Sequence, residues 1–249
     1  MLGHEVIPFR QGFQYLNYPL PEDIDFFFHL SAYGNHFDQQ DPIRIYRANT
    51  EELWEILNHV KNIPIKGFFN FSTSGHVLES DTFYGATKMA GEYLARAFAR
   101  QYKKPIVNIR PYSIYGPGEA EHRFIPTIIR QGLAGGELEL SEGVHDWMYI
   151  DDFIDALMLV MDNVNLLQQQ SIDMGTGEQT SNREVADILS QYLPDLKIKP
   201  LLKLDRQYDT VTSWKADTSK LAGLGILRTH SLKEGLWKTL KWYEEALHG

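Results

Sequence analysis

The chain has 249 residues, of which 43% are hydrophobic and 23% charged, proportions typical of a folded domain with its own core. Its 33 acidic residues outnumber the 24 basic ones and give a formal net charge of −9, which excludes a general nucleic-acid binder. The absence of cysteine excludes disulfides, thiolate metal sites and a cysteine nucleophile, and we expect no metal site. No apolar run is long enough to span a bilayer, and residues 1–4 do not begin a signal peptide, so we expect a cytoplasmic protein without a membrane partner.

The first half of the chain alternates apolar runs with amphipathic segments. The apolar runs predict strands, and the two richest in phenylalanine are continuous enough to be buried on both faces. These strands are expected at Glu5–Phe9, Ile24–Leu30, Gly67–Phe71 and Ile106–Ile109. An amphipathic helix is expected in the second half of Asp41–Asn62, and a long helix over Phe83–Tyr102.

The second half of the chain continues in the same order. A helix over residues 125–133 is expected to end at Gly135-Gly136, because glycine is favoured just after a helix C-terminus. One more strand and three more helices are expected, at Ser171–Met174, Asp151–Met161, Asn182–Tyr192 and Ser231–Leu247. Strands that alternate with helices predict a parallel sheet covered on both faces, with ligands at the carboxyl ends of its strands.

Tyr84 and Lys88 are the first residues that indicate a chemistry. They lie four positions apart in YGATK and therefore share one face of the expected helix. A phenol with a pKa of ~10 is a poor base at neutral pH, but a neighbouring ammonium favours the phenolate and lowers that pKa. Ser74 follows a buried strand, and we expect it to bind the same substrate hydroxyl. The three residues suit proton transfer in alcohol–ketone interconversion, with hydride supplied by a nicotinamide; the competing interpretation is a Tyr-x-x-x-Lys spacing that arose by chance.

Eight segments in chain order carry a wider pattern. They are HLSA (His29–Ala32), NFSTSGHV (Asn70–Val77), YGATKMAGE (Tyr84–Glu92), IRPYSIYGPGE (Ile109–Glu119), HDWMYIDDFIDA (His145–Ala156), SIDMGTGEQTS (Ser171–Ser181), KADTSKLAGLG (Lys215–Gly225) and KEGLWKTLKWY (Lys233–Tyr243). Together they resemble the extended short-chain dehydrogenase/reductases, specifically the NAD-dependent epimerase/dehydratase family that acts on nucleotide sugars. The resemblance covers nearly the whole chain.

This resemblance implies a fold and a division into domains. The fold would be α/β, with a Rossmann-like parallel sheet and a smaller C-terminal substrate lobe. Residues 1–115 would form the cofactor and catalytic domain, incomplete at its N-terminus. Residues 116–249 would form mainly the substrate lobe, from which about 145–180 would return to the sheet.

The resemblance also implies a role for each matching residue. Tyr84 would be the general acid/base and Lys88 its activator and a ligand of the nicotinamide ribose, while Ser74 occupies the catalytic Ser/Thr position. The cofactor would further contact Leu30, Ser31, Ala32, Phe71, Ser72, Pro111 and Ser113. The substrate would contact His76, Ser113, Phe124, His145 and Arg206.

The beginning of the chain departs from the family pattern. Family members open with a strand, a G-x-x-G-x-x-G turn and a helix, and the glycines let the backbone approach the cofactor's pyrophosphate. This chain begins at the segment that matches the second strand, and its sequence contains no such turn. Two interpretations stay open: a true beginning upstream, or a protein that has lost cofactor binding. We expect the 249-residue chain to bind nicotinamide cofactors weakly or not at all.

Individual site residues depart from the pattern as well. Arg10 stands where NAD users place an acid, so it is either a ligand of the NADP 2′-phosphate or an exposed arginine, and the cofactor is NAD or NADP. Gly75-His76 replaces the Asp-Glu of 4,6-dehydratases, which disfavours water elimination and leaves His76 as either an acid near the sugar or a loop residue. His145 replaces a diphosphate-binding arginine, and Ser113 replaces a common asparagine. Arg206 either binds the diphosphate or pairs with a neighbouring aspartate.

The function implied is that of an NAD(P)-dependent epimerase or 4-keto reductase acting on a nucleotide sugar. The alternative is a non-catalytic Rossmann-like protein that binds a nucleotide sugar or a homologous subunit. Because the family pairs helices such as Phe83–Tyr102 into a four-helix bundle, we expect a homodimer with either function.

Overall fold

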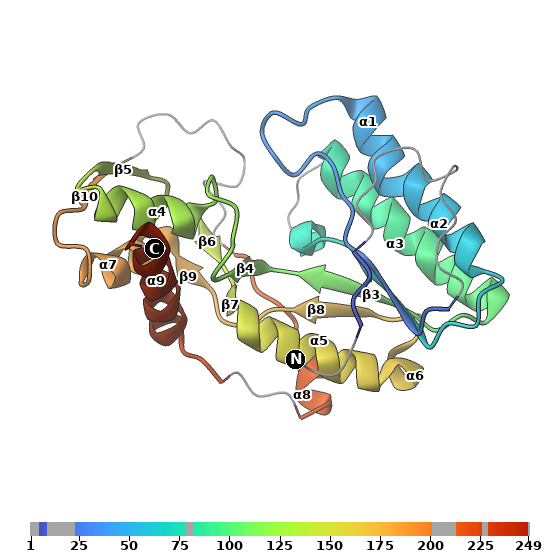
Figure 1. Ribbon diagram of the computed structural model, residues 1–249. Coiled ribbons are helices and arrows are strands. Elements are labelled where there is room, and N and C mark those ends of the chain that lie inside the picture. Colours follow the sequence, from blue (N-terminus) through green and yellow to red (C-terminus); the bar gives the residue numbers. More distant parts are fainter. Residues whose placement is uncertain (1–4, 9–22, 78–81, 201–212, 226–228, 249) are drawn as a thin grey trace. The chain divides into compact units, whose positions relative to one another are not determined.

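The computed structural model describes residues 5–8, 23–77, 82–200, 213–225 and 229–248 (Figure 1). The chain divides into two compact units, which are described separately below. The first unit comprises Met1–Phe71, Asp81–Asn108 and Gln168–Gln170. The second unit comprises Ser72–Ser80, Ile109–Leu167 and Ser171–Gly249.

The sheet of the first unit is parallel and rich in phenylalanine. Strand β1 (Phe26–His29) pairs in parallel with β2 (Gly67–Phe71), in a register that places His29 opposite Asn70. Every residue of β2 is buried, as expected for a strand covered on both faces. Strand β3 (Ile106–Pro111) follows β2 in the strand order, and its second half belongs to the second unit, where β8 (Ser171–Met174) comes next.

The helices of the first unit begin at side-chain caps. The carboxylate of Asp41 accepts hydrogen bonds at the start of α1 (Pro42–Tyr46), and the chain continues through a π-helical turn (Arg47–Glu51) into α2 (Glu52–Val60). The long helix α3 (Phe83–Tyr102) begins at Thr82, whose hydroxyl accepts from the N–H of Gly85. Such caps satisfy backbone groups that the first turn of a helix leaves without a partner.

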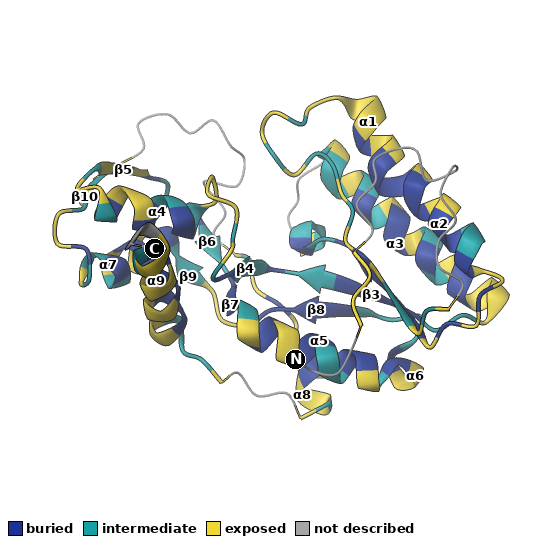
Figure 2. Ribbon diagram, viewed as in Figure 1, coloured by how far each residue is buried: buried dark blue, intermediate teal, exposed yellow. Residues whose placement is uncertain are grey.

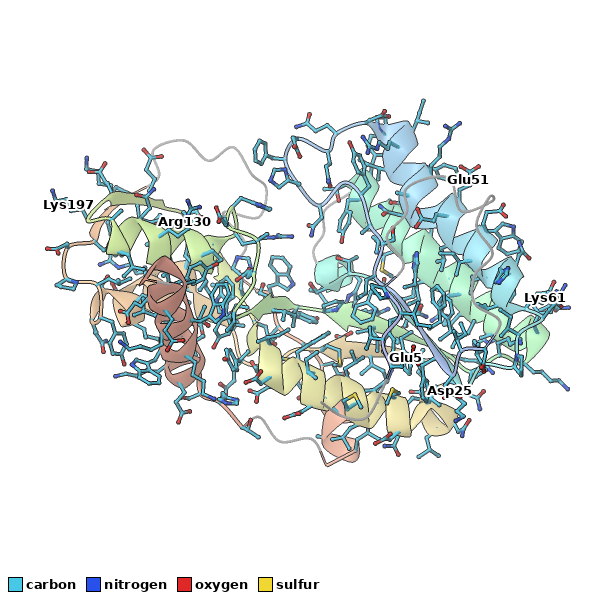
Figure 3. The ribbon with its side chains drawn as sticks, viewed as in Figure 1. Glu5, Asp25, Glu51, Lys61, Arg130 and Lys197 are labelled. Atoms are coloured by element: carbon cyan, nitrogen blue, oxygen red, sulfur yellow. The ribbon has the colours of Figure 1, made fainter. Side chains whose placement is uncertain are left out.

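Apolar side chains of α2 and α3 form the core of the first unit together with β2. The buried residues of this core include Leu53, Ile56, Leu57, Val60, Phe68, Ala95, Phe98 and Ile106. Buried and exposed stripes alternate along both helices, as their amphipathic pattern predicts (Figure 2). Charged side chains such as those of Glu51 and Lys61 are exposed and lie at the surface (Figure 3).

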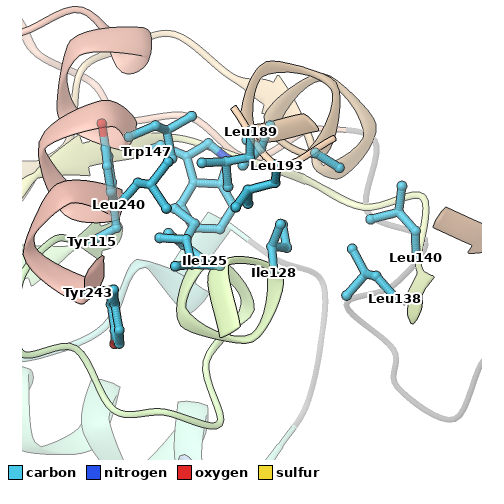
Figure 4. Packing of buried hydrophobic residues seen from close by; sticks show 14 of the residues in the cluster. Tyr115, Ile125, Ile128, Leu138, Leu140, Trp147, Leu189, Leu193, Leu240 and Tyr243 are labelled. Carbon is cyan, nitrogen blue, oxygen red and sulfur yellow. The ribbon is translucent and has the colours of Figure 1, made fainter. Parts of the chain in front are cut away.

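The second unit contains short two-stranded sheets. β4 (Ser113–Tyr115) pairs in parallel with β7 (Trp147–Tyr149), β5 (Glu137–Leu140) pairs in parallel with β10 (Lys197–Pro200), and β6 (Val144–His145) pairs antiparallel with β9 (Thr180–Ser181). Its helices are α4 (Phe124–Leu133), α5 (Ile150–Asp162), α6 (Val164–Leu167), α7 (Asn182–Ser190), α8 (Ser219–Gly223) and α9 (Leu232–His248). A large apolar cluster joins α4, α7, α9 and β7 (Figure 4).

The predicted α/β fold with its parallel sheet is confirmed. One predicted strand is wrong: residues 5–8 of Glu5–Phe9 form neither strand nor helix, and Phe9 lies outside the described residues. The side chain of Val6 is 80% exposed, so no strand among the described residues buries this apolar run. The domain boundary expected at residue 115 stays a prediction. Among the described residues, no helix is both long and apolar enough to cross a membrane.

Candidate active site

Helix α3 places the two predicted proton-transfer residues on one face. Tyr84 is half-buried in its first turn, and Lys88 lies one turn further along. The side chain of Lys88 is only 4% exposed. An ammonium buried to this degree needs partners that stabilise its charge.

A carboxylate on another helix of the first unit acts on this charge. Burial lowers the pKa of Lys88 from 10.5 to about 8, while the charge of Glu52 on α2 opposes this shift. Nε2 of His29, at the end of β1, lies 4.0 Å from Oε1 of Glu52. Burial and, to a smaller extent, the charge of Lys88 lower the pKa of His29 to about 3. His29 is therefore neutral.

A chain of hydrogen bonds continues from His29 across the sheet. Nδ1 of His29 lies 3.2 Å from Oδ1 of Asn70, and Nδ2 of Asn70 donates to Oδ1 of Asn108 over 2.8 Å. Nδ2 of Asn108 donates to the backbone carbonyl of Glu92 on α3. His29, Asn70 and Asn108 are each at most 2% exposed. The sequence analysis did not predict this chain of hydrogen bonds.

Glu52 is the residue of this cluster that sequence reasoning missed. It is 8% exposed, although glutamate is rarely buried without a partner. A signal was available in its spacing, because Glu52 stands four and eight positions before the buried Ile56 and Val60. A carboxylate on the apolar stripe of a helix indicates a buried cation nearby.

The residues expected to contact the cofactor differ in their exposure. Leu30 is 65% exposed, Ala32 is exposed and Ser31 is half-buried, as ligand-contacting residues after a strand would be. Phe71 and Ser72 are buried at the end of β2. Pro111 is half-buried at the end of β3, in the second unit. Arg10 lies outside the described residues.

Ser74 lies in the second unit, whereas Tyr84 and Lys88 lie in the first, so each is described within its own unit. Ser74 is buried and opens a short 3-10 helix (Ser74–Val77). In that helix, Nδ1 of His76 lies 3.3 Å from the carbonyl of Thr73, and Nε2 lies 3.7 Å from Asp173. Asp173 is also bound by Arg110 and by the hydroxyl of Tyr112. His76, Arg110 and Asp173 border a cavity of about 230 Å³, which Lys215, Asp217 and Lys220 also line.

The remaining predicted substrate residues come together elsewhere in the second unit. Oγ of Ser113 lies 2.9 Å from Nδ1 of His145, and the ring of His145 lies 4.8 Å from the rings of both Trp147 and Trp214. Phe124 stacks on Trp147 at 5.7 Å. Burial lowers the pKa of His145 to about 4, so its ring is neutral and offers hydrogen bonds rather than charge. Arg206 lies outside the described residues.

Asp146 supports this aromatic cluster, and sequence reasoning had missed it. It is fully buried, and its carboxylate accepts hydrogen bonds from the N–H groups of Thr176, Gly177 and Ala216 and from the hydroxyl of Thr176. The carboxylate thereby ties the segment after β8 and the segment around Ala216 to the chain between β6 and β7. Among the described residues, no group of three or more acidic or histidine side chains could hold a metal ion.

A family model matches the part of the chain that contains Ser74, Tyr84 and Lys88. The model of the NAD dependent epimerase/dehydratase family matches residues 17–175, more than half of the chain. The chain belongs to this family. Its predicted resemblance is thereby confirmed.

Curated relatives agree with this membership. The chain is 25% identical to a probable GDP-L-fucose synthase 1 of Oryza sativa, with 71% of this chain and 56% of that protein aligned. It is 24% identical to a dTDP-glucose 4,6-dehydratase of Neisseria gonorrhoeae, over 83% of this chain and 61% of the dehydratase. The chain thus spans about three fifths of the length of these curated relatives.

Solved structures of epimerases share the fold. An epimerase from Methanothermobacter thermautotrophicus superimposes with a TM-score of 0.79 at 23% identity, over 90% of this chain and 73% of that chain. A UDP-glucuronic acid 4-epimerase from Bacillus cereus, solved with UDP-glucuronic acid and NAD, superimposes with a TM-score of 0.78 at 23% identity, over 90% of this chain and 77% of that chain.

Proposed function

We propose that the protein is an NAD(P)-dependent epimerase or 4-keto reductase of a nucleotide sugar. Tyr84 exchanges a proton with the hydroxyl at C4 of the sugar, Lys88 favours the phenolate of Tyr84, and Ser74 binds the same oxygen. The observation that carries the proposal is the desolvated ammonium of Lys88, one helical turn from Tyr84. A buried cation acts on a neighbouring phenol more strongly than a hydrated one, because little water screens it.

The residues present fit one end of a nicotinamide cofactor. Lys88 and Tyr84 would bind the nicotinamide ribose, and the exposed Leu30 and Ala32 would contact the rest of that end. When bound, the cofactor accepts or supplies the hydride while Tyr84 moves the proton. The sequence contains no glycine-rich turn for the pyrophosphate, so we expect weak binding by this chain. Arg10 stays a candidate ligand of an NADP phosphate.

The substrate proposal is supported by the aromatic cluster of the second unit. Ser113 and His145 offer hydrogen-bonding groups beside the rings of Phe124, Trp147 and Trp214, a combination suited to the sugar-nucleotide end of a substrate. Related structures that carry UDP-glucuronic acid or UDP-glucose with NAD support this substrate class. Arg206 and His76 stay candidate ligands of the diphosphate and the sugar.

A homodimer is the partner that we propose. Helices α2 and α3 carry large aromatic side chains at the surface: Trp54 is 41%, Phe83 is 65% and Tyr93 is 60% exposed. Exposed aromatic residues of this size are enriched where protein surfaces associate. We therefore place the dimer contact on these two helices.

A second candidate function is a non-catalytic protein that binds a nucleotide sugar or a homologous subunit. The 249 residues contain no glycine-rich turn of the kind that binds a cofactor's pyrophosphate. The second candidate differs from the first in one measurable respect, because a binding protein leaves the sugar chemically unchanged.

Turnover of nucleotide sugars tests the proposal. The 249-residue protein is incubated with UDP-glucose or UDP-glucuronic acid and saturating NAD or NADP, and the sugar is followed by NMR. We expect the 4-epimer to form, or, with a 4-keto sugar and deuterated NADH or NADPH, deuterium to appear at C4. A folded protein that binds nucleotide sugars without converting any of them would contradict catalysis and favour the second candidate.

A further inference from the structure

The segment that leads into α9 is held by a buried carboxylate of α5. Asp152 lies in the first turn of α5, and its side chain is 3% exposed. The carboxylate accepts hydrogen bonds from the N–H and the hydroxyl of Thr229 and from the N–H of His230. All of these residues belong to the second unit. The hydrogen bonds stabilise a charge that would otherwise be costly to bury.

The ring of His230 contacts the same carboxylate on one side and a lysine on the other. Nδ1 lies 2.8 Å from Oδ1 of Asp152, and Nε2 lies 2.8 Å from Nζ of Lys238 on α9. The side chain of His230 is 18% exposed, whereas Lys238 is an exposed residue. The imidazole thus joins a buried anion to an exposed cation.

These two contacts fix the protonation of the ring. Burial raises the pKa of Asp152, but the hydrogen bonds from Thr229 and His230 outweigh burial and hold that pKa below its usual value, so the carboxylate is ionised. An ionised carboxylate can only accept, so Nδ1 of His230 carries a proton. An ammonium can only donate, so Nε2 carries a lone pair and accepts from Lys238. Both contacts form together only in the neutral imidazole with its proton on Nδ1.

We infer that His230 is a pH-sensitive junction between α5 and α9. The neutral imidazole joins Asp152 to Lys238. When acid adds a proton to Nε2, an N–H group faces the ammonium of Lys238, so this contact breaks and the lysine side chain moves into solvent. The imidazolium stays paired with Asp152. This inference does not depend on the proposed function.

The charged groups around His230 determine which contact gives way. α5 carries Asp151 and Asp152, and α9 carries Glu234, whose charge and that of His230 act on each other. These carboxylates favour the protonated imidazole, and Lys238 opposes it. Asp152 is buried and bound by several donors, whereas the exposed Lys238 is free to rotate into water. Protonation therefore moves Lys238 and leaves Asp152 in place.

Tyr149 is the titratable group that faces the junction from β7. Its ring lies 4.9 Å from the ring of His230, and Nζ of Lys238 lies 5.7 Å from its centre, within the range of a cation–π contact. Burial raises the pKa of Tyr149 above its ordinary value, so the phenol stays neutral while His230 titrates. Movement of Lys238 into solvent ends this contact as well.

The tautomer of His230 is measured first, on the unaltered 249-residue protein. Long-range ¹H–¹⁵N NMR spectra at about pH 8, where an ordinary histidine is neutral, distinguish a protonated from an unprotonated ring nitrogen. We expect the proton on Nδ1 and none on Nε2. A proton on Nε2 would overturn the inference, because Nε2 could then not accept from Lys238.

The second measurement follows the lysine side chains while the pH is lowered from about 8 to about 5, the range in which histidines titrate. In protein labelled with ¹³C-lysine, with its signal assigned by Lys238→Met, we expect Lys238 to shift with the same midpoint as the ring of His230. Lys233 on the same helix donates to the amide of Gln191 and should show no such step. In His230→Gln the step at Lys238 should disappear. A missing step in the unaltered protein, or one that persists in His230→Gln, would overturn the inference.

The third measurement is the pKa of His230 in a variant without the lysine. Lys238→Met removes the cation that opposes protonation, so the pKa of His230 should rise by about half a unit or more, a threefold or larger fall in its acid dissociation constant. The matched control Lys233→Met removes an equal charge from the same helix and should leave this pKa unchanged. Equal pKa values of His230 in the two variants would contradict a contact between His230 and Lys238.

Discussion

At the scale of single residues, the burial of Lys88 makes stability depend on pH. Its pKa is about 8 in the folded protein against an ordinary value of 10.5, so between these pH values the unfolded chain binds more protons and stability rises with pH. Over this window the folded protein should gain ~3 kcal/mol from Lys88, at 1.36 kcal/mol per pKa unit. Urea unfolding at both ends of the window measures the gain as the difference between the wild type and Lys88→Met.

Lys88→Met is the right reference because other groups titrate in the same window and cancel in the difference. The burial penalty of Lys88 is present in full below pH 8 and disappears as the pH approaches 10.5. A difference between the two proteins that does not change with pH would contradict the burial of a charged Lys88.

Asp146 provides a second prediction at this scale. Its buried carboxylate accepts from three N–H groups and one hydroxyl, which belong to Thr176, Gly177 and Ala216. Asp146→Asn places an NH₂ group against some of these donors and should destabilise the protein by ~3 kcal/mol in urea unfolding. Asp155→Asn, on the exposed side of α5, should change stability by less than ~0.5 kcal/mol. Equal effects of the two substitutions would show that Asp146 has no such role.

At the scale of elements, α2 and α3 make a prediction about assembly. If Phe83 and Tyr93 lie in the dimer contact, Phe83→Glu together with Tyr93→Glu places charges in an apolar interface and should yield monomers. Sedimentation velocity measures the change. Phe37→Glu alters a similarly exposed aromatic residue outside these helices and should leave the dimer intact. A wild-type monomer, or a double variant that stays dimeric, would contradict this contact.

The elements that sequence predicted best are those with one dominant signal. β2 has the predicted bounds because it is a short apolar run, and β8 ends as predicted because Gly175-Thr176-Gly177 follows it. α3 has the predicted bounds because polar and turn residues precede and follow it. The π-helical turn between α1 and α2 carries no such signal, because its residues suit any helix. Glu5–Phe9 failed because an apolar run forms a strand only where another strand pairs with it.

The candidate site was predictable where its residues lie close in the sequence or in a known motif. Tyr84 and Lys88 share one turn of α3, and Ser113 and His145 were singled out by resemblance before the structure placed them in contact. Glu52 lies 36 positions before Lys88, and only the packing of α2 against α3 brings their charges together. Partners contributed by separate helices leave little trace in a single sequence.

At the scale of the whole molecule, the glycine pattern of the 249 residues affects the affinity that we expect for a nicotinamide cofactor. The chain spans 56% and 61% of two curated relatives, and its sequence contains no glycine-rich pyrophosphate turn. For the 249-residue protein we expect a Kd for NAD or NADP on the order of 1 mM or weaker, measured by isothermal titration calorimetry. A Kd in the micromolar range would contradict this expectation and would call for a different pyrophosphate site.

The central claim is that Tyr84, activated by Lys88, moves the proton in the reaction. The most direct test is the kcat of Tyr84→Phe, measured with the substrate that the wild type converts and with Tyr93→Phe as the control for an exposed tyrosine of the same helix. The account predicts that kcat falls at least about 100-fold in Tyr84→Phe, with the circular dichroism spectrum unchanged, and stays at the wild-type value in the control. An unchanged kcat in Tyr84→Phe would contradict it.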